Sequence, residues 1–290
     1  MIDSSAPRGT GAAPPPADDD ASGPAAPDAS GPAAPDASGP AAPDASPAAW
    51  EALLAGRTGP VPPPGAELVE RYGPLVAHRG PLVLAQLGQS LDGFIASRTG
   101  HAEFVTGPED REHLHRLRAL VEAVVVGVGT VVADDCRLTV RAVPGPHPTR
   151  VVLDPSARAP LTSAVLTDGA APTLWVVGED ADAPAAPAPH VAVLRVPVGE
   201  PGLAPRAVLE ALARRGLRRV LVEGGGRTVS GFLAAGTLHR LYLTTAPMLI
   251  GDGVPGIRFP GADHLSGALR APVRRFVLGD DLCTELTFRA

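Results

Sequence analysis

A predicted strand, a glycine-rich bend and a predicted helix follow one another in this 290-residue chain, in the stretch Val220-Leu221-Val222-Glu223-Gly224-Gly225-Gly226-Arg227-Thr228. Its first three residues are apolar and predict a short buried strand. The three glycines predict a tight bend, and Thr228–Ala235 is expected to form a helix. A backbone without Cβ atoms can approach a ligand closely, and a helix N-terminus offers N–H groups to a phosphate. A plain strand–helix turn explains the glycines equally well, so this bend alone leaves both interpretations open.

A second glycine bend comes after the predicted buried strand Ala123–Val126. Its sequence, Gly127-Val128-Gly129-Thr130, resembles a dinucleotide-binding fingerprint, but Val132 stands at the third glycine position, so support for a Rossmann fold is weak. Open α/β sheets bind ligands in the crevice at the carboxyl ends of their strands. Two such bends after neighbouring strands therefore favour a nucleotide site over a purely structural role.

Strand and helix patterns alternate on both sides of these bends. Leu82–Leu87 reads as a first buried strand, and Pro108–Val121 as a helix that begins with a capping box formed by Thr106 and Glu109. The alternation indicates an α/β fold with a mostly parallel sheet and antiparallel C-terminal strands. The other predicted elements are the strands Arg150–Leu153, Thr173–Val177, Val191–Val196, Leu241–Thr245, Arg274–Leu278 and Cys283–Phe288 and the helix Pro205–Arg215.

The chain divides into three parts. Residues 1–47 contain an eight-residue repeat, first seen at 20–27, which has no large apolar side chain to bury. Such a segment cannot offset the entropy of ordering, so we expect a disordered tail. Residues 48–80 form an N-terminal extension with two short helical patterns, and whether it packs on the domain is left open. Residues 81–290 have the length of a single domain.

The amino-acid composition excludes several classes of function and of binding site. The formal net charge is −6, which argues against nucleic acid as the main partner because phosphate contacts need a basic surface. All 25 basic residues are arginine, which excludes a Schiff-base or P-loop lysine. The two cysteines, Cys136 and Cys283, cannot form a disulfide framework or a thiolate zinc site. We expect no metal, no membrane span and no secretory signal, and therefore a cytoplasmic protein.

The histidines suggest no catalytic site. His101 and Glu103 match half of a zinc deaminase signature, but the Cys-x-x-Cys half that would supply two thiolates does not occur. His113 and His115 are two residues apart on the predicted helix, so they point to different sides and cannot chelate one ion.

Charged residues come directly after the second bend. Asp134-Asp135 is first, and Arg137 and Arg141 are next. A helix cap and solvated charges would account for these residues. Beside phosphate-binding turns, however, the arginines are equally plausible ligand clamps, because a guanidinium binds phosphate through two hydrogen bonds.

In this order, the motifs resemble one known family. It is the reductase domain at the C-terminus of the bifunctional riboflavin-biosynthesis deaminase/reductase, which also exists as a standalone pyrimidine reductase. The resemblance covers about residues 81–288. The motifs are Ser90-Leu91-Asp92-Gly93, Val105-Thr106-Gly107, Leu117-Arg118-Ala119, Val126-Gly127-Val128-Gly129-Thr130-Val131, Ala133-Asp134-Asp135, Leu138-Thr139-Val140-Arg141, Arg150-Val151-Val152-Leu153-Asp154, Val222-Glu223-Gly224-Gly225-Gly226, Ala246-Pro247 and Leu249-Ile250-Gly251.

The resemblance implies a dihydrofolate-reductase-like, three-layer α/β/α sandwich, usually a homodimer. It implies hydride transfer from NADPH to the ribosyl group of a pyrimidine ribosyl phosphate of the 5-amino-6-(5-phosphoribosylamino)uracil type, which gives a ribitylamino product. Arg118 and Arg141 would hold the 5′-phosphate, and no proton donor is identified. The implied cofactor contacts are Gly88, Phe104, Thr130, Asp134, Gly224, Gly225 and Gly226, and the implied substrate contacts are Arg118, Leu138, Arg141 and Glu223.

The chain departs from the family pattern at four positions. Ala102 stands where the family often has a serine that contacts substrate, and Phe104 replaces a common tryptophan. Pro155 and Cys136 replace a frequent serine and a usual proline. The alternatives are therefore a reductase of another pyrimidine or a pterin, and a non-catalytic ligand-binding protein that keeps the fold.

Overall fold

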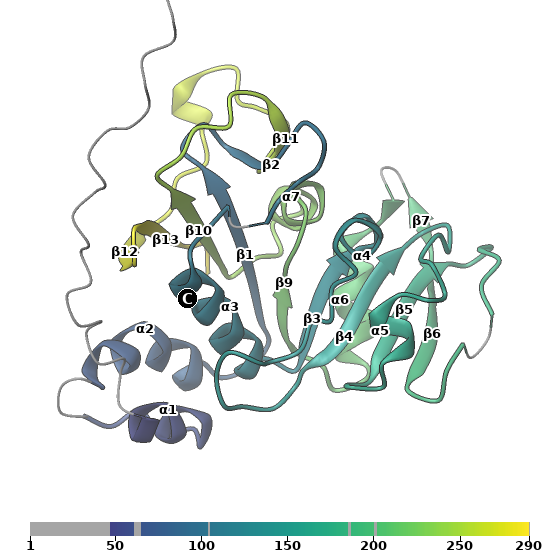
Figure 1. The fold of residues 1–290 in the computed structure, drawn as a ribbon, viewed down its shortest axis with the longest axis horizontal. Coiled ribbons are helices and arrows are strands. Elements are labelled where there is room, and N and C mark those ends of the chain that lie inside the picture. Colours follow the sequence, from purple (N-terminus) through teal and green to yellow (C-terminus); the bar gives the residue numbers. More distant parts are fainter. Residues whose placement is uncertain (1–46, 61–64, 104, 185–186, 200–201, 290) are drawn as a thin grey trace, which may run out of the picture. The chain divides into compact units, whose positions relative to one another are not determined.

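The computed structural model of the protein describes residues 47–60, 65–103, 105–184, 187–199 and 202–289 (Figure 1). Apart from Pro47, which begins the first helix, the tail predicted to be disordered lies outside the described residues. In the described part the helices are α1 (Pro47–Leu54), α2 (Ala66–Ala77), α3 (Pro108–Ala119), α4 (Val128–Asp134), α5 (Ala164–Thr167), α6 (Pro205–Ala213) and α7 (Gly226–Ala234), with a 3-10 turn at Leu265–Gly267.

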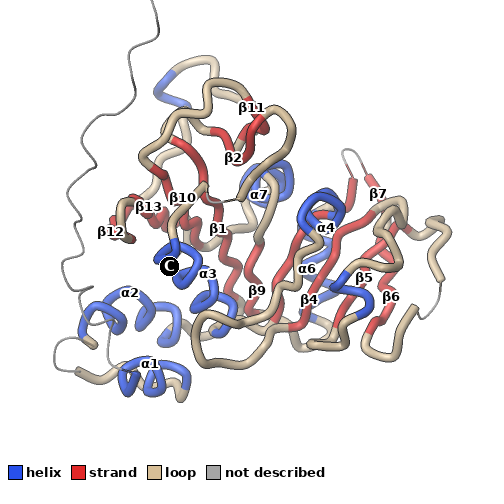
Figure 2. Tube along the Cα trace, in the orientation of Figure 1, coloured by secondary structure: helices blue, strands red, loops and turns tan. Residues whose placement is uncertain are grey.

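One nine-stranded sheet organises the domain, in the order β12-β13-β10-β1-β9-β3-β4-β5-β6. Its strands are labelled in Figure 1 and drawn in red in Figure 2. The seven strands from β10 to β6 are parallel, and β13 and β12 continue the sheet antiparallel. The α/β class with antiparallel C-terminal strands is confirmed. The sheet strands are β1 (Leu82–Ser90), β3 (Ala123–Gly127), β4 (Thr149–Asp154), β5 (Thr173–Gly178), β6 (Val191–Val196), β9 (Arg219–Val222), β10 (Arg240–Ala246), β12 (Val273–Leu278) and β13 (Asp281–Thr287).

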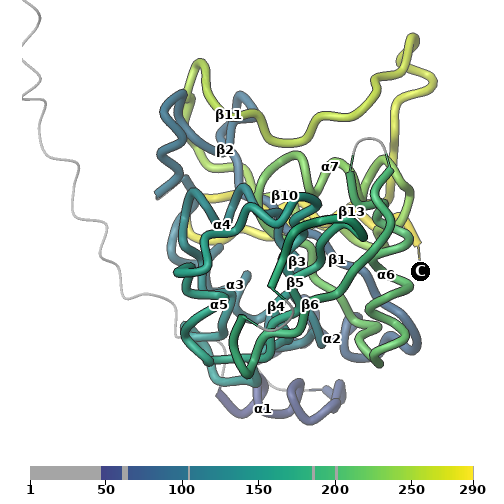
Figure 3. The backbone as a smooth tube through the Cα atoms, turned by 90° about the vertical axis from the view of Figure 1, so that its right-hand side faces the viewer, coloured from purple at the N-terminus to yellow at the C-terminus, as the bar shows by residue number. Residues whose placement is uncertain are grey.

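Helices cover both faces of this sheet, which makes three layers. On one face, α6 and α7 pack on alternate residues of the central strands, for example Val83, Val125 and Val222. On the other face, α3 covers β1 and β10, and α4 and α5 cover β3, β4 and β5. Figure 3 shows α3, α4 and α5 on one side of the strands and α6 on the other. Strands buried on both faces explain the continuous apolar runs in the sequence.

The N-terminal extension belongs to this packing. Trp50 of α1 and Tyr72 of α2 are 3% and 0% exposed, and they lie in the same apolar cluster as Leu84 of β1 and Leu117 of α3. The Trp50 indole N–H donates to the Pro144 carbonyl at 2.7 Å. The extension therefore covers one side of α3, a point that the sequence left open.

Two features differ from the sequence expectation. No side-chain cap closes the start of α3: its N-cap is Gly107, so the predicted capping box of Thr106 and Glu109 is wrong. Thr106 instead hydrogen-bonds to the buried Asp110 carboxylate. Two pairings of short strands, one between distant segments and one between neighbouring segments, were also not predicted. They are β2 (Phe94–Ser97) with β11 (Gly253–Pro255) and β7 (Val198–Gly199) with β8 (Gly202–Leu203).

Candidate active site

The two glycine bends meet at the carboxyl edge of the sheet. β3 and β9 are parallel neighbours with Val125 opposite Val222, so the residues after both strands emerge side by side. The Gly225 N–H donates to Thr130 Oγ1 at 3.2 Å. A Cβ atom on Gly224 would lie 2.7 Å from the same oxygen. The bends are therefore interlocked, as a shared binding edge requires.

Two of the three glycines in the bend after β9 have a structural reason. Gly224 has φ +96°, a conformation that favours glycine. A Cβ on Gly226 would lie 2.0 Å from the Gly256 carbonyl oxygen, so the backbone of the β11 loop occupies that space. Gly225, the N-cap of α7, meets only Thr130 Oγ1 at 3.8 Å. Protein packing thus explains Gly224 and Gly226, and Gly225 is the glycine with open space around it.

A buried ion pair begins directly after β9. Glu223 is 5% exposed and Arg118 of α3 is 7% exposed. Arg118 Nε donates to Glu223 Oε1 at 2.7 Å and Nη2 donates to Oε2 at 2.6 Å. Burial opposes the charge of Arg118, but the Glu223 carboxylate outweighs it and raises the pKa of the guanidinium. The third nitrogen, Nη1, donates to the Thr139 carbonyl at 2.9 Å, so all three Arg118 nitrogens have partners.

The Thr139 carbonyl belongs to a loop that comes after α4 and carries Arg141. Leu138 is 2% exposed and has φ +55°, unusual for a residue with a side chain. Arg141 is exposed and donates through Nη1 to Thr139 Oγ1 at 2.8 Å. Burial and the neighbouring charges of Arg118 and Arg137 lower the pKa of Arg141. This local excess of positive charge favours an anion.

The two arginines predicted to bind the phosphate, Arg118 and Arg141, are therefore not equally available to it. Arg118 and Arg141 both donate a hydrogen bond to Thr139. The other two nitrogens of Arg118 donate to Glu223, so its guanidinium has no nitrogen without a protein partner. In the part of the chain that the structure describes, Arg141 forms no ion pair. The donors available to a phosphate are thus on Arg141.

Gly88 of β1 lies over a buried carboxyl group. A Cβ on Gly88 would be 2.7 Å from the Thr106 methyl carbon and 3.5 Å from Asp110 Oδ2. Asp110 is 2% exposed and accepts hydrogen bonds from Thr244 Oγ1 at 2.6 Å and Gln86 Nε2 at 3.2 Å. Burial raises the pKa of Asp110.

Residues 81–271 match the family model described as the RibD C-terminal domain. The chain belongs to the RibD C-terminal domain family. It is 37% identical over 220 residues to the 2,5-diamino-6-ribosylamino-4(3H)-pyrimidinone 5′-phosphate reductase of Methanothermobacter thermautotrophicus, covering 72% of this chain and 99% of that protein. It is 34% identical to the riboflavin biosynthesis protein RibD of Aquifex aeolicus, covering 74% of this chain and 60% of that protein.

Solved structures support the same family. The deaminase/5-amino-6-(5-phosphoribosylamino)uracil reductase of Thermotoga maritima matches with a TM-score of 0.61 and 25% identity over 77% of this chain and 62% of that one. The riboflavin biosynthesis reductase Rib7 of Saccharomyces cerevisiae shares the fold, with a TM-score of 0.59 and 19% identity over 76% of this chain and 97% of that one. The dihydrofolate-reductase-like fold class is confirmed.

The remaining predicted positions of this RibD C-terminal domain lie in different surroundings. Asp134, the last residue of α4, is exposed, and partial burial of its carboxyl group raises its pKa. Asp135 ends α4 with φ +42° and accepts the Ala164 N–H at 2.7 Å, so it has a structural role. Phe104 lies outside the described residues. Ligand binding at the predicted positions stays a prediction.

Asp110, Gln86 and the contacts of His115 were not predicted from the sequence. Asp110 in the first turn of α3 looks like an ordinary helix-start carboxylate. Only the neighbouring β1 and β10 reveal that it is buried. His113 and His115 do point apart, as predicted: His113 Nδ1 lies 2.7 Å from the Tyr72 hydroxyl, whereas His115 Nδ1 accepts the Arg141 N–H at 2.8 Å.

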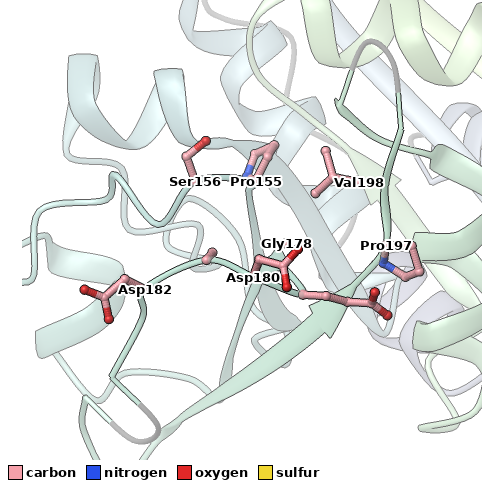
Figure 4. Close-up of a pocket in the computed structure, with 9 residues that line it drawn as sticks. Pro155, Ser156, Gly178, Asp180, Asp182, Pro197 and Val198 are labelled. Carbon is pink, nitrogen blue, oxygen red and sulfur yellow. The ribbon is translucent and has the colours of Figure 1, made fainter.

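A cavity of about 550 Å³ opens at the carboxyl ends of β4, β5 and β6 of the RibD C-terminal domain (Figure 4). It lies on the same edge of the sheet as the bends, because these strands are all parallel. Its lining includes the carboxylates Glu179, Asp180 and Asp182 and none of the predicted site residues. Three carboxylates disfavour a phosphate group, so this cavity is a poor candidate for a phosphate site.

Proposed function

We propose that this chain is an NADPH-dependent reductase of riboflavin biosynthesis. It reduces the ribosyl group of 5-amino-6-(5-phosphoribosylamino)uracil to give the ribitylamino product. The observation that carries the proposal is the meeting of the Thr130 bend, the Glu223 bend and the Arg141 loop at one sheet edge. Family membership supports this chemistry.

The 2,5-diamino pyrimidinone ribosyl phosphate is a second candidate substrate. The relative that the chain matches over 99% of its length carries the name of that reductase. The two compounds share the ribosyl phosphate, so the Arg141 loop would serve both. The groups that distinguish their pyrimidine rings would face residues other than Arg141.

The cofactor site fits a pyridine nucleotide at the interlocked bends. The first turn of α7 has amide N–H groups without intrahelical acceptors, and the helix dipole adds a partial positive charge. Gly225 leaves open space there, and Thr130 holds its backbone in place. A pyrophosphate is the group that such a turn favours. The residues that would hold the cofactor are Gly88, Phe104, Thr130, Asp134, Gly224, Gly225 and Gly226.

When bound, the nicotinamide supplies the hydride. The chain's own residues supply alignment, which is the main catalytic contribution when the cofactor carries the chemistry. Arg141 would bind the substrate 5′-phosphate, and Glu223, held rigid by Arg118, would accept a hydrogen bond from the substrate. Leu138 would pack against the substrate from the buried side of the loop.

The partner is a small molecule, and we propose a homodimer that works in the cytoplasm. No helix in the described ranges is long and apolar enough to cross a membrane.

The phosphate contact is tested by Arg141→Ala. We expect the substrate KM to rise about tenfold or more, the range for a lost hydrogen bond to a charged group. The NADPH KM should change far less, because the cofactor is proposed to bind at the glycine bends. Steady-state kinetics with each ligand varied in turn measure the two constants. An equal rise in both would place Arg141 outside the phosphate site.

The test of the activity is oxidation of NADPH followed spectroscopically with each of the two pyrimidine ribosyl phosphates. Turnover with the uracil compound supports the proposal, and faster turnover with the 2,5-diamino compound would select the second candidate. Titration of the protein with NADPH gives a readout independent of turnover. Absence of NADPH binding would refute the enzymatic assignment, and binding without oxidation of NADPH by either compound would indicate another substrate.

A further inference from the structure

One face of α3 holds the Arg141 loop at two points. His115 and Arg118 are three residues apart, so their side chains lie on the same side of the helix. Arg118 Nη1 donates to the Thr139 carbonyl at 2.9 Å. His115 Nδ1 accepts the Arg141 N–H at 2.8 Å and lies 3.4 Å from the Ala142 nitrogen. The helix therefore binds a carbonyl and, two residues later, an N–H of the loop.

The state of His115 suits the role of an acceptor. Its Nδ1 can accept an N–H only when the proton is on Nε2 and the ring is neutral. His115 is 8% exposed. Burial, with the charges of Arg118 and Arg141, lowers the pKa of His115 to about 4, so the ring is neutral near pH 7.

The loop needs such an anchor because it lies outside the sheet. Its backbone turns through the left-handed conformation at Asp135 and Leu138, and no ladder of strand hydrogen bonds fixes residues 139–142. The Val140 N–H donates to His147 Nδ1 at 3.2 Å, but His147 is exposed and water can replace it. The buried His115 is the stronger restraint on the residue that carries the guanidinium.

We infer that His115 is a positioning residue for phosphate recognition: by accepting the Arg141 N–H it aims the Arg141 side chain at the substrate 5′-phosphate. The inference rests on the proposed function, in which Arg141 binds that group. Its ligand class is a phosphate monoester. His115 acts through Arg141 and does not touch the reacting atoms.

Two substitutions separate this role from packing. In His115→Asn the amide oxygen can occupy the position of Nδ1, whereas in His115→Gln the longer side chain carries its amide to the position of Nε2. Asparagine has the lower helix propensity, so a purely structural role predicts the worse result for His115→Asn. Acceptance of the Arg141 N–H predicts the opposite order.

The experiment measures kcat and both KM values for the full chain. We expect His115→Gln to raise the substrate KM roughly threefold to tenfold, the range for one lost hydrogen bond. The NADPH KM and kcat of this variant should stay within about twofold of the values for the unsubstituted protein. His115→Asn should have a substrate KM close to that of the unsubstituted protein. In an Arg141→Ala background, His115→Gln should cause no further rise, because the two residues act as one unit.

Three outcomes would overturn the inference. An equal rise in the substrate KM for both His115 variants would indicate packing alone. A raised substrate KM in Arg141→Ala together with an unchanged substrate KM in His115→Gln would show that His115 does not position Arg141. The proposed contact between Arg141 and the phosphate would still stand. An unchanged substrate KM in Arg141→Ala would refute the proposed contact itself, and the inference with it.

A measurement on the unsubstituted protein does not depend on the folding of the variants. The ¹⁵N chemical shifts of His115 report which ring nitrogen carries the proton. We expect protonated Nε2 and unprotonated Nδ1, and both signals should be retained when inorganic phosphate is added. A ring protonated at Nδ1 could not accept the Arg141 N–H and would overturn the inference.

Discussion

Glu223 combines a proposed contact with substrate and a buried ion pair, and these two roles compete for the same carboxylate. Its carboxylate is proposed to meet substrate, yet it is almost fully buried and paired through both oxygens with Arg118. A buried ion pair adds little net stability, because desolvation of two charges offsets their attraction. Removal of one partner is costly, since it leaves an unpaired buried charge. The pair therefore serves rigidity and orientation more than stability.

Three variants of this pair should differ in stability. Arg118→Met and Glu223→Leu should each lower the free energy of unfolding by about 3–5 kcal/mol, as for other broken buried pairs. The double variant should recover much of that loss, because neither charge remains, but it should stay inactive. Urea unfolding and NADPH oxidation measure the two effects. A loss in the double variant equal to the sum of the two single losses would show that the two side chains are not coupled, and would contradict this account of the pair.

At the scale of an element, the bend between β9 and α7 separates packing from binding. Gly226→Ala would place a Cβ atom 2.0 Å from the Gly256 carbonyl oxygen, which is backbone and cannot move aside cheaply. We expect a loss of roughly 1–3 kcal/mol in the free energy of unfolding, the range for overpacking. The matched control is Gly225→Ala, whose Cβ would meet only Thr130 Oγ1 at 3.8 Å.

Gly225→Ala should therefore cost no more than about 1 kcal/mol in stability, the cost of an N-cap change. It should still raise the NADPH KM, because its methyl group enters the open space proposed for the cofactor. Thermal unfolding and steady-state kinetics measure both variants. Equal stability of the two alanine variants would contradict the packing at Gly226, and an unchanged NADPH KM in Gly225→Ala would argue against cofactor binding at this bend.

The contrast between elements also explains how much the sequence could predict. The sheet strands could be located from their apolar runs, because a strand buried on both faces has no polar alternation. The pairing of Phe94–Ser97 with Gly253–Pro255 joins segments far apart in the chain, and no local pattern encodes it. The two bends could be found from their glycines. The ion pair between Arg118 and Glu223 could not be predicted, because it depends on the contact between α3 and the end of β9.

The N-terminal extension is an element whose importance the sequence left undecided. The indole of Trp50 is buried in the cluster that covers α3, and its N–H holds the Pro144 carbonyl of the segment after Arg141. Trp50→Ala should lower the free energy of unfolding by roughly 3–5 kcal/mol, the range for a buried aromatic residue. The exposed neighbour Glu51 gives the control Glu51→Ala, for which we expect about 0.5 kcal/mol or less.

Deletion of residues 1–46 should leave both turnover and the thermal midpoint nearly unchanged, since the composition of that segment offers little to bury. Circular dichroism and NADPH oxidation test the deletion and the Trp50 variant side by side. A large loss of activity on deletion would contradict the disorder predicted for the tail. A stable Trp50→Ala variant would show that the extension is dispensable for the core.

For the molecule as a whole, the described residues leave part of one face of the sheet exposed at its antiparallel edge. α6 and α7 cover the central strands and Leu286 of β13 packs on the same cluster, but four side chains on that face are exposed: Val273, Arg275 and Val277 of β12 and Leu282 of β13. Val277 and Leu282 lie directly opposite each other and are 73% and 43% exposed, and Val273 on the same face is 41% exposed. Arg275, opposite Thr284, lies between Val273 and Val277 on this face, so apolar and charged side chains are mixed there. Exposed apolar side chains with an arginine among them are a combination found in protein–protein contacts. It supports the proposed homodimer and suggests where the second copy packs.

The homodimer predicts a specific sensitivity at this edge. Val277→Asp places a carboxylate opposite Leu282 in the proposed contact, where association would desolvate the charge. We expect the variant to be monomeric by light scattering, at concentrations where the unsubstituted chain is dimeric. Val198→Asp is the matched control, because Val198 is also exposed, at 53%, but lies beyond β6 at the other end of the sheet.

Both variants should fold normally, since neither side chain belongs to the core. If the unsubstituted chain is already monomeric, the homodimer is wrong. If Val277→Asp leaves a dimer intact, the second copy packs on a different surface.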